Sequence, residues 1–298
     1  MKRILALVLV AMMALAFTPA MAEKTTTIGM MLSDTANQFF VTMYEAAQQK
    51  AAELGVELIV LDAANDAAKD VSNMEDLLSR GVDAILYNPV DSDAAPAVVE
   101  LANKANVPVI TIDRSSNGGE VVSHIASDNV YGGKIAGEYI VSLLPDGGEI
   151  AEIQGQAGAS AAKDRGDGFH QAVDTIANIK VVSSQIGNWD RTQALSIMEN
   201  VMQANPNVKA VFCHNDVMAL GVVEACQQAG RSDIIIVGFD ADKDAIAAIQ
   251  EGTMMATVQQ LPDQMGIIGV QTAVDYLAGK TVEPKIGVQV ALITKTAQ

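Results

Sequence analysis

The chain has 298 residues, with 19 lysines and arginines against 36 aspartates and glutamates, which gives a formal net charge of −17. A nucleic-acid-binding protein is expected to carry the opposite sign, so this composition argues against DNA or RNA as a partner. Half of the residues are hydrophobic, which is ordinary for a globular protein and argues against a disordered chain.

The first 22 residues have the pattern of a secretion signal. Lys2 and Arg3 give a positive start, an apolar stretch runs from Ile4 to Phe17, and small residues at Ala20 and Ala22 precede the expected cleavage point. The apolar stretch is too short for a membrane span, which needs about 20 residues. We therefore expect residues 1–22 to be removed and a soluble protein to be released into the periplasm of a bacterium with two membranes.

Apolar runs alternate with amphipathic helical stretches along the rest of the chain. Strands are expected over residues 27–32, 56–62, 84–88, 107–112, 123–126, 149–154, 180–187, 210–213, 234–239, 256–260 and 288–294. The helices expected between them include residues 39–54, 71–80, 130–144, 192–204, 217–229 and 265–277. This βαβ repetition predicts an α/β protein with parallel sheets that carry helices on both faces. The strands are too many for one doubly wound sheet, so we expect two lobes that divide near Ser127 and Asp128.

The two cysteines, Cys213 and Cys226, are expected to be buried free thiols. One ends a strand and the other lies about three turns into the following helix, roughly 15 Å further along the helix axis. A disulfide needs Cα atoms within about 7 Å of each other.

Sequence motifs for catalysis, nucleotide binding and metal binding are absent. No G-x-G-x-x-G, Walker-type loop or G-x-S-x-G elbow occurs, and the nearest glycine-rich segment, residues 132–137, lacks the dinucleotide spacing. His124, His170 and His214 lack paired metal-ligand spacing, which favours structural roles for them. The acidic segment 240–251 imitates a calcium loop, but alanines replace the required glycine and one oxygen donor, which favours a capped helix. We therefore predict no catalytic residue, no metal site and no cofactor.

Polar or aromatic residues stand at the C-terminal ends of many expected strands, where parallel sheets form their ligand crevice. They are Ser33, Asn37, Asn88, Asp113, Arg114, Trp189, Asn215, Phe239, Asp240 and Gln260. Each residue alone could be a turn residue or a helix cap, and Asp113 and Arg114 alone could form a surface salt bridge. Together these side chains predict a pocket that binds a neutral polyol without transforming it, because planar groups pair with hydroxyls and aromatic faces pack on C–H groups.

Several stretches of the chain resemble the type I periplasmic sugar-binding family, and within it the ribose-binding proteins of bacterial ABC importers. They are NQFF (37–40), NPVDSDA (88–94), VPVITIDR (107–114), VVSHIASDNV (121–130), GGKIAG (132–137), NDVMALG (215–221), VGFD (237–240) and QLPDQ (260–264). The resemblance covers essentially the whole chain after the secretion signal. It implies two Rossmann-like, doubly wound lobes joined by three crossings. The N-terminal lobe would comprise residues 24–127 and 261–287, and the C-terminal lobe residues 128–260 and 288–298.

The resemblance also implies a sugar site between the lobes. Its residues would be Ser33, Asn37, Phe39, Phe40, Asn88, Asp113 and Arg114 in the N-terminal lobe and Arg165, Trp189, Asn215, Phe239, Asp240 and Gln260 in the C-terminal lobe. The charged and amide side chains would bind ring hydroxyls, and Phe40 and Trp189 would pack on the ring. Trp189 departs from the phenylalanine that the best-known ribose binders carry at this position.

These features together imply a monomeric solute-binding protein whose lobes close on a monosaccharide. D-Ribose is the expected ligand, and allose, another pentose, a ketose or a furanose-like signalling molecule are the alternatives. The implied partners are the permease and ATPase of an ABC transporter and, as a further option, a chemoreceptor. A sugar-responsive repressor would need a basic helix-turn-helix where this chain has its secretion signal. A secreted sugar-acting enzyme is the remote alternative, and its only candidate carboxyl pair, Asp113 and Asp240, is better explained as hydroxyl acceptors.

Overall fold

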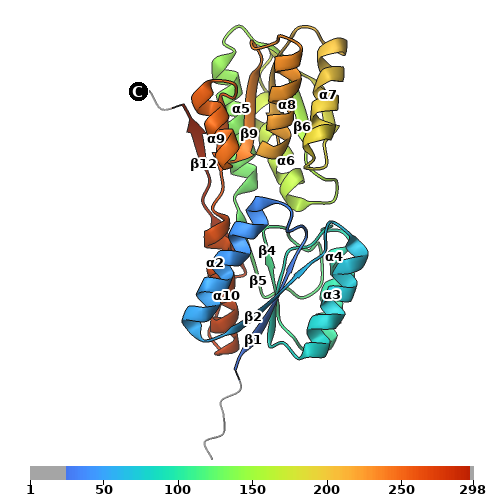
Figure 1. Cartoon of the computed structure of the whole chain (residues 1–298), viewed down its shortest axis with the longest axis vertical. Helices are drawn as coiled ribbons and strands as arrows, with labels where there is room; N and C mark the ends of the chain where they lie inside the picture. The colour runs from blue at the N-terminus through green and yellow to red at the C-terminus, as the bar shows by residue number, and fades with distance from the viewer. Residues whose placement is uncertain (1–24, 296–298) are drawn as a thin grey trace, which may run out of the picture.

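The computed structural model describes residues 25–295, so the secretion signal expected in residues 1–22 lies outside the described part. Two six-stranded sheets form two lobes that lie one above the other along the long axis of the molecule (Figure 1). The α/β class with two doubly wound lobes, predicted from the sequence, is confirmed.

The first sheet has the strand order β11-β5-β4-β3-β1-β2, and all its strands run parallel. The strands are β1 (Thr27–Leu32), β2 (Glu57–Asp62), β3 (Ala84–Tyr87), β4 (Val109–Ile112), β5 (Ser123–Ser127) and β11 (Lys285–Val288). One face packs on helices α2 (Gln38–Leu54) and α10 (Pro262–Leu277), and the other packs on α3 (Ala67–Arg80) and α4 (Ala95–Lys104) (Figure 1).

The second sheet repeats this plan with the order β12-β10-β9-β8-β6-β7. The strands are β6 (Gly148–Gln154), β7 (Ile179–Ile186), β8 (Val208–Cys213), β9 (Ile235–Asp240), β10 (Ala256–Gln259) and β12 (Ala291–Thr294), the last antiparallel to β10. One face packs on α5 (Asn129–Leu143) and α6 (Ser160–Val173), and the other on α7 (Arg191–Ala204), α8 (Asp216–Gln228) and α9 (Lys243–Glu251). Within residues 25–295 no helix is both long and apolar enough to cross a membrane.

The chain passes between the sheets after β5, after β10 and after β11. The single strand expected over residues 288–294 is wrong. Val288 pairs with Ser127 in the first sheet, whereas β12 pairs with β10 in the second. Gln289 alone interrupts the apolar residues from Val288 to Ile293, and one polar residue does not signal that Gln289 and Val290 carry the chain from one lobe to the other.

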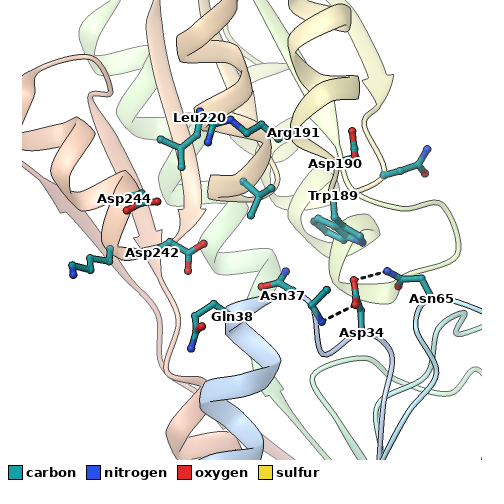
Figure 2. Close-up of a pocket in the computed structure, with 14 residues that line it drawn as sticks. Asp34, Asn37, Gln38, Asn65, Trp189, Asp190, Arg191, Leu220, Asp242 and Asp244 are labelled. Atoms are coloured by element: carbon teal, nitrogen blue, oxygen red, sulfur yellow. Dashed lines mark hydrogen bonds between the residues drawn. The ribbon is translucent and has the colours of Figure 1, made fainter.

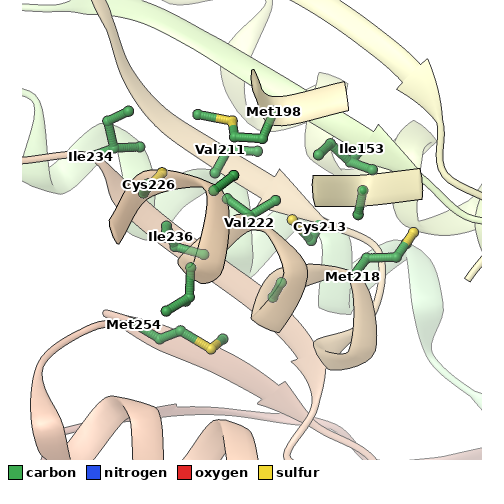
Figure 3. Packing of buried hydrophobic residues seen from close by; sticks show 14 of the residues in the cluster. Ile153, Met198, Val211, Cys213, Met218, Val222, Cys226, Ile234, Ile236 and Met254 are labelled. Atoms are coloured by element: carbon green, nitrogen blue, oxygen red, sulfur yellow. The ribbon is translucent and has the colours of Figure 1, made fainter. Parts of the chain in front are cut away.

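Each sheet is buried between two hydrophobic clusters, and the largest of these clusters contains both cysteines (Figure 3). Cys213 on β8 and Cys226 on α8 are free and buried among Met198, Val211 and Val222. Burial raises the pKa of Cys226 to about 11 and that of Cys213 above its ordinary value, which keeps both thiols protonated near neutral pH. The prediction of buried free thiols is confirmed.

Candidate ligand-binding site

The C-terminal ends of the strands in both sheets converge on a narrow pocket of about 30 Å³ between the lobes. The lining residues are Asn37, Phe39, Phe40, Asp113, Arg114, Ala161, Arg165, Trp189, Asn215, Asp240 and Gln260. All of them except Ala161 were predicted from the sequence. Of the remaining predicted residues, Asn88 and Phe239 contact the lining residues Asp113 and Arg165, and Ser33 contacts Asn88, so all three lie behind the pocket wall.

A tight turn brings the adjacent side chains of Asp113 and Arg114 to the same pocket. The backbone N–H of Arg114 donates to the carbonyl of Ile112 at 2.7 Å, and Asp113 between them has a left-handed φ of 63°. In a regular strand, successive side chains would point to opposite faces. Aspartate is one of the few residues other than glycine that tolerate a left-handed backbone, so the residue type at position 113 suits this turn.

Asn88 fixes the carboxylate of Asp113 from behind. Its Nδ2 donates to Oδ2 of Asp113 and to the carbonyl of Ile112, both at 3.0 Å. Its Oδ1 accepts from the backbone N–H of Ser33 at 3.0 Å. Ser33 and Asn88 therefore act as supports for Asp113, which is a different position from the one that the sequence predicted for them.

Arg114 is held by the backbone and by an aromatic ring. Its guanidinium donates to the carbonyls of Pro89 and Val90 at 3.3 and 3.2 Å, and it lies 5.6 Å from the ring centre of Phe40. Burial raises the pKa of Asp113, and the positive charges of Arg114 and Arg165 oppose that rise. The two arginines thus help to keep Asp113 available as a hydrogen-bond acceptor.

Arg165 on α6 is the corresponding cation of the second lobe. Its Nε donates to Oδ1 of Asn129 at 2.9 Å and its Nη1 to the carbonyl of His214 at 2.5 Å. The guanidinium lies 3.8 Å from the ring centre of Phe239 and its Nη1 is 3.7 Å from Oδ1 of Asp240. Phe239 therefore supports Arg165 from beneath, as Phe40 supports Arg114.

Asp240 and Gln260 form the other polar wall of the second lobe. Nε2 of Gln260 donates to Oδ1 of Asp240 at 2.7 Å, and Asp240 has a left-handed φ of 126°. Asp216, at the start of α8, holds the loop that follows Asp240. Its Oδ2 accepts from the backbone N–H of Asp242 at 2.8 Å, and its Oδ1 accepts from the hydroxyl of Thr257 at 2.7 Å. Sequence reasoning missed Asp216, because an acid at the start of a helix reads as an ordinary partner of the helix dipole.

Asn37 and Asn215 occupy matching positions at the starts of α2 and α8. Oδ1 of Asn37 accepts from the backbone N–H of Phe39 at 2.9 Å, and Oδ1 of Asn215 accepts from that of Met218 at 3.0 Å. Each side-chain oxygen caps its helix. The alternative of a helix cap, left open from the sequence, is therefore correct for both residues, although both also line the pocket.

Trp189 closes the pocket from the loop between β7 and α7. Asn188 and Trp189 both have left-handed backbones, with φ of 54° and 62°, in a turn closed by the backbone N–H of Asp190 donating to Gly187 at 2.9 Å. The indole lies 5.6 Å from the guanidinium of Arg165 and 6.0 Å from that of Arg114. It therefore contacts the arginines of both lobes at once.

A larger cavity of about 580 Å³ lies outside the pocket, between the same two lobes. Figure 2 shows Asn37 and Gln38 at the start of α2 facing Trp189 and Asp242 across this space, with Asp34 hydrogen-bonded to Asn65 beside Trp189. Asn37 and Trp189 line both spaces. These two residues therefore separate the inner pocket from the outer cavity.

The histidines stand outside the pocket. His214 shares a 2.9 Å hydrogen bond with Glu152 behind Arg165, and Nδ1 of His124 lies 2.9 Å from the hydroxyl of Thr111. Burial lowers the pKa of His124 to about 4. Across residues 25–295 no three His, Cys, Asp or Glu side chains are grouped so that they could hold a metal ion. The wall offers two arginines, two carboxylates, three amides and aromatic faces, which suits a neutral ligand rich in hydroxyl groups.

A family model described as a periplasmic binding protein domain matches residues 28–281. The chain belongs to the periplasmic binding protein family. The family resemblance noted in the sequence is thereby confirmed.

Curated relatives of this periplasmic binding protein align along nearly its whole length. The ribose import binding protein of Escherichia coli (strain K12) is 47% identical over 296 residues, which is 99% of each chain. The ribose import binding protein of Bacillus subtilis (strain 168) is 44% identical over 273 residues, 92% of this chain and 88% of the relative. Among solved structures, an ABC transporter solute binding protein from Mycobacterium smegmatis with bound glycerol matches with a TM-score of 0.87 and 34% identity, covering 91% of this chain and 94% of that one.

Proposed function

We propose that this protein captures D-ribose between its lobes and delivers it to an ABC importer. The observation that carries the proposal is the pairing of an aspartate and an arginine in each lobe, Asp113 with Arg114 and Asp240 with Arg165, at one narrow pocket. The proposal draws further support from the family and from relatives that are named ribose import binding proteins.

The two pairs suit a small polyol because their charges balance. Asp113 is 4% exposed and Arg165 is 3% exposed, so a ligand held between them would be almost fully enclosed. A vicinal pair of hydroxyls can donate to a carboxylate and accept from a guanidinium at the same time. A sugar that lacks one hydroxyl would leave a buried charged group without a partner, which gives the pocket its selectivity.

The proposed mechanism is closure of the two lobes about the three connections between the sheets. The boundaries predicted from the sequence place residues 24–127 and 261–287 in one lobe and residues 128–260 and 288–298 in the other. We propose them with one change: Val288 belongs to the first lobe, because it pairs with Ser127 in the first sheet. Hydrogen bonds already join the lobes on one side of the pocket: the backbone N–H of Ser115 donates to Oγ of Ser160 at 2.9 Å, and that of Ser92 donates to the carbonyl of Gly158 at 2.9 Å. Such contacts would form on closing and break on opening.

The cellular setting follows from the same proposal. We propose that residues 1–22 direct the chain to the periplasm, where it works as a monomer and as a binding protein rather than an enzyme. The closed form would be the form that the permease and ATPase of the transporter recognise, and a chemoreceptor could read the same change of shape.

A thermal-shift screen followed by calorimetry tests the proposed ligand. The panel holds D-ribose, D-allose, D-arabinose, a ketopentose and myo-inositol, because a tight ligand raises the melting temperature by mass action. D-Ribose should give the largest shift and should be recovered unchanged after incubation. If another sugar raises the melting temperature more than D-ribose does, that sugar is the ligand instead. If the sugar is converted to a product, the protein is not a binding protein.

A further inference from the structure

Trp189 carries a buried hydrogen-bond donor that the protein itself does not satisfy. Its Nε1 is buried and has no hydrogen-bond partner among the residues that the structure describes. Native proteins pair the large majority of their buried polar atoms, so each exception calls for an explanation. Trp189 is also the single tryptophan of the chain.

The indole cannot easily turn its N–H elsewhere. The backbone on both sides of Trp189 is fixed by the turn from Gly187 to Asp190, and Nδ2 of Asn188 donates to Oε1 of Gln193 at 3.0 Å. The far edge of the indole lies against Gly155, where an added Cβ would come within 2.0 Å of Cη2 and 2.1 Å of Cζ2. A side chain at position 155 would therefore displace the ring.

The described residues around the indole offer no acceptor to its N–H. One edge of the ring is covered by Gly155, and Arg114 and Arg165, which are cations without acceptor atoms, lie near it from the two lobes. Trp189 lines the outer cavity as well, but a ligand of the proposed function would lie in the inner pocket. Trp189 also lines the inner pocket between the lobes.

We infer that the indole N–H of Trp189 donates a hydrogen bond to one hydroxyl oxygen of the bound sugar and thereby selects for that hydroxyl. The inference rests on the proposed function, since it concerns the ligand of the same pocket. A phenylalanine at this position would pack on the sugar but would have no donor to offer. Trp189 is therefore a specificity-determining residue, with Gly155 as the residue that makes room for it.

A double-mutant cycle between protein and ligand tests this inference. Calorimetry would compare wild type and Trp189→Phe with D-ribose and with its 1-, 2-, 3-, 4- and 5-deoxy forms, because the 4-hydroxyl is free in the pyranose ring and the 5-hydroxyl in the furanose ring. For D-ribose the substitution should weaken binding by about 5- to 30-fold, which is what one hydrogen bond contributes. One deoxy form lacks the hydroxyl that accepts from the indole, and for this form Trp189→Phe should not weaken binding further. For the other deoxy forms the substitution should weaken binding as much as it does for D-ribose. An equal loss for every ligand would overturn the inference, because it would mean that the indole only packs.

The matched control is Phe39→Leu, which removes an aromatic ring that lines the same pocket from the opposite lobe and whose printed ring contact is with Phe40 rather than with an arginine. It should weaken binding of D-ribose and of all five deoxy forms by the same factor. If Phe39→Leu shows the same selective effect as Trp189→Phe, the effect comes from packing and the inference fails.

A second measurement needs no variant. The single tryptophan gives a single indole resonance in a ¹⁵N-labelled sample. Its proton should move downfield with D-ribose and move less with the deoxy form that the cycle identifies, and identical shifts with all ligands would contradict the inference. If wild type does not bind D-ribose at all, the proposed ligand is wrong, and the same cycle is run with deoxy forms of the sugar that gave the largest thermal shift.

Discussion

Gly133 on α5 lies directly against the backbone carbonyl of Arg165 on α6. A Cβ added to Gly133 would stand 2.0 Å from the carbonyl oxygen, and one added to Gly168 would stand 1.9 Å from the carbonyl oxygen of Val130. The two helices can approach this closely only because both positions lack a side chain. This contact sets the position of α6, and with it the position of the guanidinium of Arg165 in the pocket.

Replacing Gly133 with alanine should therefore damage binding as well as stability. The added methyl group must push α6 away from α5, which would move Arg165 relative to Asp240. We expect the free energy of unfolding to fall by about 1–3 kcal/mol, as for other overpacked sites, and the affinity for D-ribose to fall by about tenfold or more. Chemical denaturation and calorimetry measure the two effects.

The matched control for this variant is Gly287→Ala on β11, where an added Cβ would meet no atom within 4 Å. It should leave the affinity for D-ribose unchanged. Gly133→Ala with wild-type affinity would show that the position of Arg165 does not depend on this helix contact.

Asp113→Asn should abolish most of the binding and leave the fold intact. Asparagine tolerates the left-handed backbone at this position, and its Oδ1 can still accept from Asn88. The variant loses the negative charge that would accept hydrogen bonds from the sugar, so we expect the dissociation constant for D-ribose to rise about 100-fold. Calorimetry measures the affinity, and a cooperative thermal unfolding transition of the ligand-free variant checks the fold. Near-normal affinity would remove Asp113 from the site.

Most residues that were predicted for the crevice lie at one pocket, because parallel sheets place the ends of their strands together. Asp113, Asn215 and Gln260 could be assigned to one crevice from their positions after apolar runs, without knowledge of any contact. The supports behind the pocket could not be assigned in this way. The importance of Gly133 depends on which helix lies opposite, and a tryptophan in a left-handed turn such as that of Trp189 contradicts the usual preference for glycine or asparagine.

Stability should depend on pH below about 4.5 through Glu152. This side chain is fully buried and pairs with His214 and His170, and it also accepts from Ser184 and Gln154. Burial would raise the pKa of Glu152, but these partners together lower it to about 2. The carboxylate therefore contributes stability that is fully present above pH 4.5, its ordinary pKa, and that is lost as the pH falls toward 2.

The variant Glu152→Gln isolates this contribution, which amounts to at most about 3 kcal/mol. The free energy of unfolding of wild type should exceed that of the variant at pH 6, and the difference should shrink steadily between pH 4.5 and pH 3. Urea denaturation at each pH measures it. A difference that stays constant over this range would mean that the folded protein does not hold Glu152 ionised.

Ser160→Ala should weaken closure of the lobes without altering the pocket wall. The hydroxyl of Ser160 accepts from the backbone N–H of Ser115 in the other lobe at 2.9 Å, whereas Ser160 does not line the pocket. The loss of one hydrogen bond from the closed form should lower the affinity for D-ribose by about fivefold, mainly through faster release. Stopped-flow fluorescence of Trp189 measures the release rate.

Ser142→Ala is the control, since the hydroxyl of Ser142 donates only within α5, at 2.7 Å to the carbonyl of Tyr139. If both variants release the sugar at the wild-type rate, the contact between Ser115 and Ser160 does not hold the lobes together.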